Sequence, residues 1–302
     1  MKKLLDYIHN EPRMVSVLLG VNLEAFQCLT VQVEKAQQSA QQEQEAKKVR
    51  VNAKGAGRPK KLSLEESIAL CLFYLRQNPT FEVLVLIFGV SRSEAHATFH
   101  WGLNWIRKIL PASLYEEFGS DPELWSLIQE ILCDETLLTD STEQARERPQ
   151  DNEVQKAWYS GKKKQHTYKT QIIGTSAGEE IVDVIAGVEG PTADINLFRE
   201  QQPRLHPEQE YLGDKAYIGA ARMTTPHKKP KKQELTEAQR AENKEISGKR
   251  IFIEHLMRRL KIFRILSHQF RLKARRYRTV MLAICGLVRL KLGRIDFTIY
   301  EL

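Results

Sequence analysis

Apolar residues recur with helical spacing in the first part of the chain. Residues 14–50 pass from an apolar, helix-like pattern into a tract of Gln, Glu and Lys, which predicts an exposed helix or a linker. The next segment, 51–63, concentrates Gly, Pro and Lys, a composition typical of linkers. Its GRPKK piece resembles a minor-groove hook in which Arg58 would enter a narrow A·T groove, but a plain basic linker explains the same residues.

The stretch 63–109 carries two signals for the start of a helix. Ser-x-x-Glu patterns begin at Ser63 and at Ser91, and each precedes a run with helical periodicity. Between them a short apolar segment ends at Gly89. Helix, short helix, glycine turn and capped helix is the layout of a helix-turn-helix, although three core helices without a ligand would show the same spacing. In the helix-turn-helix, the residues that face DNA would be Arg92, Ser93 and His96.

From about residue 130 the pattern predicts strands. Segments 166–174 and 181–187, joined by the turn TSAGEE, indicate a β-hairpin, and 210–214 indicates a short strand that ends in an acid. DINLFREQQ lies between them and has a helical pattern, and a further helix contains 250–266. This order of elements predicts an α/β domain with a mixed sheet.

The charge of the chain points to a polyanionic partner. The formal net charge of the 302 residues is +8, and segment 258–278 contains nine Lys or Arg and no acid. A second cluster, HKKPKK, occupies 227–232. A membrane-surface helix would need one continuous segment with separate basic and apolar faces, whereas dispersed clusters favour a phosphate backbone. A merely solvated charged surface is the alternative.

The remaining composition predicts a cytoplasmic protein without membrane association. No stretch reaches the roughly 20 apolar residues of a membrane span, and the first residues make a poor signal peptide. The four cysteines are far apart and form no CxxC pattern, so we expect reduced thiols rather than disulfides or a zinc site.

Three acids occupy positions from which they could converge. Asp140 follows a short apolar run, Asp214 ends a predicted strand, and Glu254 lies on the late helix. Converging carboxylates repel each other, and their pKa values rise unless a cation is present. Oxygen ligands favour Mg²⁺ or Mn²⁺, and a pair of such ions about 4 Å apart suits phosphoryl transfer. Asp134 is the alternative first acid.

The late helix repeats charge along one stripe. Arg250, Glu254 and Lys261 are spaced i, i+4 and i+11, so Lys261 returns to within about 20° of Arg250. The stripe therefore presents a cation, a carboxylate and a second cation. An ordinary i,i+4 salt bridge at the surface is the simpler explanation.

Several of these segments together resemble a known family. They are GRPKKLSLEESIALCLFYLR, TDSTEQARERP, YSGKKKQHTYKTQ, GDKAYIG, RIFIEHLMRRLKIFRI and the terminal YEL. The chain, from about residue 57 to its end, resembles bacterial insertion-sequence transposases with an RNase H-like DDE catalytic domain, of the type whose last acid lies in a Y-R-E-K helix signature.

The resemblance implies a fold, a metal centre and a DNA surface. We expect a helical leader and basic linker over 1–56, a helix-turn-helix domain over 57–115 and an RNase H-like mixed sheet flanked by helices over 125–302. Asp140, Asp214 and Glu254 would be the catalytic triad and would hold two Mg²⁺ or Mn²⁺ ions. The residues that would contact DNA are Arg250, Lys261, Lys162, Lys163, Lys164, His166 and Lys169.

The activity implied is DNA transposition. The enzyme would hydrolyse a phosphodiester at each element end, and the freed 3′-OH would attack target DNA. We expect a homodimer on double-stranded DNA at the bacterial nucleoid. Two positions depart from the family pattern: Ser247 stands at the tyrosine of the signature, and Ala193 replaces the histidine before Asp194. The alternatives are a catalytically silent DNA-binding protein, either a decayed copy or a repressor, and an RNase H-like nuclease.

Overall fold

The computed structural model describes residues 4–46, 61–231 and 233–297. They form two compact units, the first made of residues up to 110 with 263–265, and the second of 111–262 and 266 onward. The expected domain limits stay predictions, and the GRPKK hook, apart from Lys61, and the terminal YEL lie outside the described residues.

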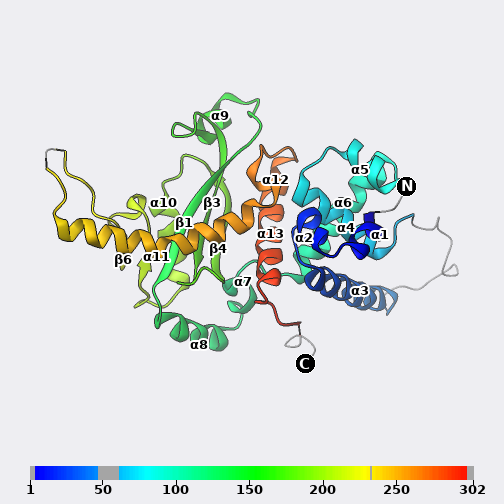
Figure 1. Ribbon diagram of the computed structural model, residues 1–302, viewed down its shortest axis with the longest axis horizontal. Coiled ribbons are helices and arrows are strands. Elements are labelled where there is room, and N and C mark those ends of the chain that lie inside the picture. Colours follow the sequence, from blue (N-terminus) through cyan, green and yellow to red (C-terminus); the bar gives the residue numbers. More distant parts are fainter. Residues whose placement is uncertain (1–3, 47–60, 232, 298–302) are drawn as a thin grey trace. The chain divides into compact units, whose positions relative to one another are not determined.

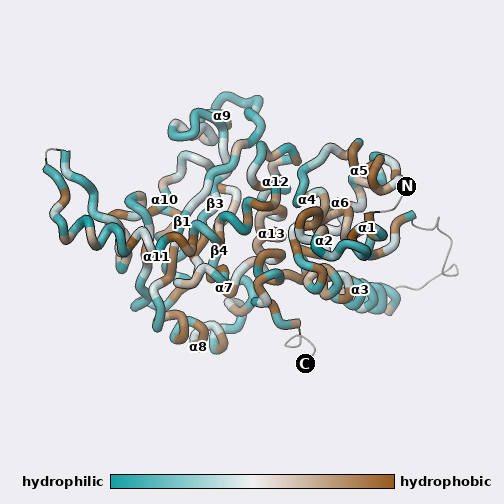
Figure 2. Tube along the Cα trace, in the orientation of Figure 1, coloured by the Kyte–Doolittle hydropathy of each residue, from teal (hydrophilic) through white to brown (hydrophobic). Residues whose placement is uncertain are grey.

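The first unit is helical. Its elements are α1 (Leu4–Asn10), α2 (Arg13–Leu19), α3 (Leu23–Ala46), α4 (Leu64–Gln77), α5 (Phe81–Phe88) and α6 (Arg92–Ile109). In α3 the buried residues lie in the first half, which agrees with the predicted change to an exposed helix, and Figure 2 shows its second half as hydrophilic. Among the described residues, no single helix is long and apolar enough to cross a membrane, and α2 with α3 passes that test only as a pair bent by 64°.

The helices α4, α5 and α6 have the predicted helix-turn-helix order. The Ser63 hydroxyl accepts a hydrogen bond from Glu66 N–H, and the Glu66 carboxylate accepts one from Ser63 N–H, which completes the predicted capping box. Helix α5 ends at Gly89, whose φ of 66° suits a residue without a side chain. The Ser91 hydroxyl then caps α6 by accepting from Glu94 N–H. Local hydrogen bonding thus fixes where these helices begin and end.

The second unit contains a mixed sheet. Its strands are β1 (Leu137–Ala145), β2 (Tyr159–Ser160), β3 (Gln165–Gly174), β4 (Ile181–Glu189), β5 (Tyr211–Leu212) and β6 (Met223–Thr224). Strands β1, β3 and β4 are antiparallel neighbours, with β3 between the other two. On the other side of β1, β5 and then β6 run parallel to it. Three antiparallel strands followed by two parallel ones form the expected RNase H-like sheet, and Figure 1 shows helices beside it.

The helices of this unit cover both faces of the sheet. They are α7 (Leu114–Phe118), α8 (Pro122–Cys133), α9 (Asn152–Trp158), α10 (Asp194–Gln201), α11 (Glu237–Lys261) and α13 (Tyr277–Lys291), with 3₁₀ turns η1 (Gln202–Arg204), η2 (Lys215–Tyr217) and η3 (Ala274–Arg276), while α12 (Arg264–Ser267) has residues in both units. The α11 and α13 side chains pack on the face of β1 that bears Thr142 and Gln144. The opposite face carries an apolar core with Trp125 of α8, Ile173 of β3 and Phe198 of α10.

One ionic cluster is enclosed within this unit. Arg289 of α13 is fully buried, and its guanidinium lies 2.6 Å from Glu180 and 2.7 Å from Glu117. It also donates to the carbonyl oxygen of Pro111 at 3.1 Å. Because every partner comes from a different segment, this cluster ties α7, the β3–β4 turn and α13 together.

Candidate active site

Asp140 lies on β1, and Asp214 follows the neighbouring parallel strand β5. The last register pair of β1 and β5 is Leu138 with Leu212, and each acid follows two residues later. Adjacent strands are about 4.8 Å apart, and the negative charge of Asp214 raises the pKa of Asp140, so the two acids are near each other beyond the paired segment of β1 and β5. The Asp140 carboxylate accepts a hydrogen bond from Ser141 N–H at 2.9 Å, and Asp214 accepts one from Ala216 N–H at 2.7 Å.

The position of Asp214 depends on tight local packing. Asp214 caps η2, and this turn ends at Tyr217, a buried ring. At the preceding Gly213, a Cβ atom would lie 2.7 Å from Tyr217 Cδ2 and 3.2 Å from Thr139 Cγ2. A side chain there would push η2 away from β1, and glycine therefore brings Asp214 close to Asp140.

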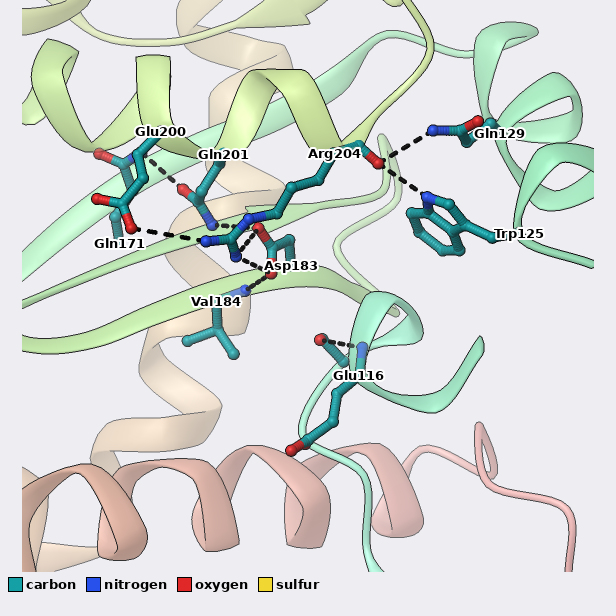
Figure 3. Close-up of polar contacts among 10 residues, drawn as sticks. Glu116, Trp125, Gln129, Gln171, Asp183, Val184, Glu200, Gln201 and Arg204 are labelled. Carbon is teal, nitrogen blue, oxygen red and sulfur yellow. Dashed lines mark hydrogen bonds and ion pairs between the residues drawn. The ribbon is translucent and has the colours of Figure 1, made fainter. Parts of the chain in front are cut away.

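A network of polar side chains contacts the hydroxyl of Tyr217. The Tyr217 hydroxyl lies 3.1 Å from the amide of Gln171, which in turn lies 2.8 Å from Gln201 of α10. Gln201 donates to Asp183 at 3.0 Å, and Arg204 pairs with the same carboxylate at 3.0 Å (Figure 3). Since this network is largely buried and hydrogen-bonded, it makes a rigid support for the turn that carries Asp214.

The surroundings of Asp140 suit a carboxylate that binds a metal cation. Burial raises the pKa of Asp140 to about 6, and the negative charges of Asp214 and Asp194 act in the same direction. The Ser141 N–H and the positive charge of Arg250 oppose this rise in pKa. Burial also raises the pKa of Tyr217, and the negative charges of Asp194, Asp140 and Asp214 add to that shift.

Glu254 lies on α11, which is seated closely against β3. At Gly174, a Cβ would approach Leu256 Cδ2 to 3.0 Å and Ile253 Cδ1 to 3.2 Å, so the absence of a side chain lets the helix rest there. Phe252 and Arg259, on one flank of α11, contact Gly178 in the β3–β4 turn.

The opposite flank of α11 bears the predicted stripe. Arg250 is close enough to Asp140 to affect its pKa, and Lys261 lines a small cavity with Thr142 and Gln144. At 100° per residue, Glu254 is about 40° from Arg250, about 20° from Lys261 and at least about 140° from Phe252 and Arg259. Helix geometry therefore directs the exposed Glu254 toward the Asp140 side of α11.

The donor set fits a divalent cation of the magnesium type. Two adjacent carboxylates supply oxygen ligands, and the raised pKa of Asp140 shows a buried acid whose charge Arg250 only partly offsets. In the part of the chain that the structure describes, no three His, Cys, Asp or Glu side chains are close enough to hold one metal together. The structure therefore does not bring Glu254 into one ligand group with Asp140 and Asp214, and the three-acid centre stays a prediction.

Lys169 and Asp194 form an ion pair near this site, and the sequence analysis did not predict that pair. Lys169 is 6 % exposed, and its Nζ lies 2.8 Å from Asp194 and donates to the carbonyl of Thr192. Lys169 was grouped with DNA-facing cations, but its charge is compensated inside the fold. The sequence feature that could have indicated this pair is Asp194 itself, which follows GPTA and stands at the start of α10.

Other predicted site residues are spread over the surface. Lys162, Lys163 and Lys164 are exposed in the turn between β2 and β3, followed by His166 on β3. Asp134 is exposed at the C-terminal end of α8 before β1 begins, a position that does not compete with Asp140. At the start of α6, Arg92 pairs with Glu82 at 2.7 Å, Ser93 is exposed, and His96 lies 3.1 Å from His100. The DNA contacts of all these residues stay predictions.

The burial of Asp140 has a measurable consequence without metal. Its folded pKa of about 6 exceeds the ordinary 3.8, so its contribution to stability is complete at low pH and is lost as the pH rises through about 6. In EDTA at about pH 8, Asp140→Asn should therefore raise the free energy of unfolding by up to about 3 kcal/mol. Near pH 4 the variant and the wild type should unfold alike.

Thermal or urea unfolding across this pH range checks the expectation. Added Mg²⁺ should stabilise the wild type and have little effect on Asp140→Asn, because the ion then lacks a charged ligand. A variant no more stable than the wild type at the higher pH would contradict a buried, charged Asp140.

Comparison with known proteins agrees with this architecture. Residues 139–289 match the family model described as DDE superfamily endonuclease, and residues 60–112 match helix-turn-helix of DDE superfamily endonuclease. A probable transposase for insertion sequence element IS702 of Microchaete diplosiphon is 31% identical over 244 residues, which cover 80% of this chain and 85% of that protein. A solved Mos1 transposase paired-end complex with left transposon end covers 78% of this chain and 88% of that chain at 13% identity, but its TM-score of 0.20 supports no structural argument.

Proposed function

We propose that this chain, which belongs to the family of insertion-sequence transposases with a DDE endonuclease domain, cuts its element ends with Asp140, Asp214 and Glu254 as metal ligands. The observation that carries the proposal is that Asp140 and Asp214 each follow the last register pair of β1 and β5 by two residues, and that the charge of Asp214 acts on Asp140. Glu254 is the acid on the flank of α11 that also bears Arg250. The positive charge of Arg250 lowers the pKa of Asp140.

The family uses divalent metal, and we assign two Mg²⁺ or Mn²⁺ ions to this centre. When bound, such ions lower the pKa of a coordinated water and stabilise charge on the attacking and leaving oxygens. The protein side chains fix the geometry. Asp140 is oriented by Ser141 N–H, and Asp214 is oriented by Ala216 N–H in η2.

The proposed reaction has two displacements. First, water attacks a phosphorus at the element end, the P–O3′ bond breaks, and the leaving 3′-oxygen takes a proton. The 3′-OH then attacks a phosphorus of target DNA, and the target's own 3′-oxygen leaves. No covalent bond to the protein is needed in either step.

The helix-turn-helix region makes this a DNA-binding chain. We propose that Arg92, Ser93 and His96 at the start of α6 read the element end, and that Arg250, Lys261 and the 162–164 lysines contact its backbone. We further propose that two copies pair two ends, and that the protein works on the nucleoid in the bacterial cytoplasm, where this substrate lies.

A second candidate is a DNA-binding protein without chemistry. It is favoured by the two departures from the family signature. Ser247 is exposed on α11, and Ala193 begins α10 without a side-chain cap. Neither position is one of the three acids.

The experiment is nicking of DNA by the full chain with Mg²⁺ and with EDTA. One duplex carries the inverted repeat that flanks this reading frame, and a control duplex has the same composition in scrambled order. Mg²⁺-dependent nicks at the repeat boundary support a transposase. Equal cleavage of both duplexes would indicate a nuclease, and binding of the repeat without any nick would indicate the silent DNA-binding protein.

A further inference from the structure

A second basic site lies farther along β1. Arg146 follows the end of β1 and pairs with Phe270 in an isolated bridge, with Phe270 N–H donating to Ala145 at 2.9 Å. A cavity of about 160 Å³ opens there. Its lining includes the cations Arg146, Arg271 and Lys273, the acid Glu147, and the rings of Tyr168 and Phe270.

The Arg146 guanidinium is held in a fixed plane. It lies 4.2 Å from the centre of the Trp158 ring and 4.7 Å from that of Tyr168. Tyr168 is itself fixed, because it stacks on Tyr277 at 4.0 Å and meets Phe270 edge-on at 5.8 Å. Two aromatic contacts of this kind remove most of the freedom of a long side chain before any ligand arrives.

The Arg146 guanidinium has an N–H donor that is not used within the part of the protein that the structure describes. Among the described residues, the buried Nε of Arg146 has no hydrogen-bond partner. A buried donor without a partner is costly, and a planar guanidinium edge matches two oxygens of a phosphate. The surroundings are positive as well: burial lowers the pKa of His166, and the charges of Arg148 and Arg146 lower it further.

The register of β1 relates this site to the proposed cutting centre. Asp140 and Arg146 are six residues apart and on the same side of the strand, because side chains alternate and β1 pairs with β3 without a register shift from Asp140 to Ala145. At about 3.3 Å per residue, the separation is about 20 Å. Along a duplex with about 3.4 Å per base pair, this distance corresponds to about six base pairs.

We propose that the Arg146 pocket binds one phosphate of the DNA backbone, about six base pairs from the phosphate that is cut. The inference deepens the proposed function and rests on it for the position of the cut. Arg146 supplies the oriented donors, and Arg271 and Lys273 surround the phosphate at the mouth. The site would hold the duplex about 20 Å from the scissile bond, beyond the part of β1 that α11 and α13 cover.

The test measures DNA affinity against salt concentration, without Mg²⁺, on the duplex that carries the flanking repeat. The variants are Arg146→Gln, Lys273→Gln and the matched control Arg199→Gln, which removes an exposed cation from α10 on the other face of the sheet. Loss of one phosphate contact should reduce the slope of log K against log salt by about one in the pocket variants, and not in the control. Affinity should fall about tenfold for Arg146→Gln.

Phosphate ethylation interference on the same DNA gives the position. With the wild type, an ethylated phosphate about six base pairs from the mapped nick should block binding, whereas Arg146→Gln should be insensitive there. Loss of sensitivity only at another phosphate would overturn this placement.

Thermal unfolding of each variant separates binding from folding. If Arg146→Gln does not fold, Lys273→Gln alone decides, since Lys273 is exposed and outside the aromatic contacts. Unchanged slopes in the folded pocket variants overturn the proposal and leave Arg146 as a structural residue. If the wild type never nicks DNA but Arg146→Gln still reduces the salt slope, the proposed cleavage is contradicted and the proposed phosphate pocket is retained.

Discussion

Glu254→Gln is expected to reduce Mg²⁺-dependent nicking of the element end by about three orders of magnitude and to leave DNA affinity nearly unchanged. The substitution keeps the size of the side chain and removes its charge. Glu254 is exposed, and the buried positions of this part of α11 are Ile253, Leu256 and Met257, so the helix should still dock. Single-turnover cleavage and gel-shift binding on one DNA measure the two effects.

The helix provides a matched control. Glu245 lies nine residues earlier, which places it about 180° around α11, and it pairs with Lys249 at 2.8 Å in solvent. Glu245→Gln should cleave like the wild type. Asp214→Ala should lose nicking as Glu254→Gln does, because each would remove one ligand of the proposed centre. Undiminished nicking by Asp214→Ala would reject the site. Undiminished nicking by Glu254→Gln alone would show that Glu254 is not part of the site.

Arg289→Met is expected to cost about 3–5 kcal/mol in the free energy of unfolding of the second unit. The change leaves Glu117 and Glu180 buried without their cation, and an uncompensated buried charge is expensive. The melting temperature of this unit should fall by roughly 10 °C. Differential scanning calorimetry on the full chain measures the change.

Two further variants isolate the cause. Arg294 pairs with Glu179 at the surface, and Arg294→Met should change stability by less than about 1 kcal/mol, because solvent screens that pair. Adding Glu117→Gln and Glu180→Gln to Arg289→Met should recover part of the loss, since the stranded charges disappear. An Arg289→Met protein as stable as the wild type would show that the enclosed cluster contributes nothing net.

Local signals explain what the sequence predicted well. The cap at Ser63 and the end of α5 at Gly89 depend on neighbouring residues alone, and both were predicted. Strands β3 and β4 also agree with their predicted segments within two residues at each end, because their apolar runs are bounded by a turn. The mixed sheet followed from the order of these elements.

Long-range placement could not be predicted in the same way. Lys169 has the same local character as the exposed lysines before it, and only the packing of α10 brings Asp194 to it. Arg289 sits in an apolar helix, and its carboxylate partners are 109 and 172 residues away. Convergence of Asp140, Asp214 and Glu254 was predicted from their positions and from the family resemblance and stays a prediction, whereas the seat of α11 on Gly174 had no sequence signal.

The seating of α11 on Gly174 has a consequence during translation. The helix-turn-helix and both strand acids leave the ribosome before α11 is made, and the last acid joins them only when that helix docks. If Glu254 is the third ligand, a nascent or truncated chain can hold DNA and cannot cut it. Unfinished copies would then occupy the ends without breaking the chromosome, and would compete with complete enzyme.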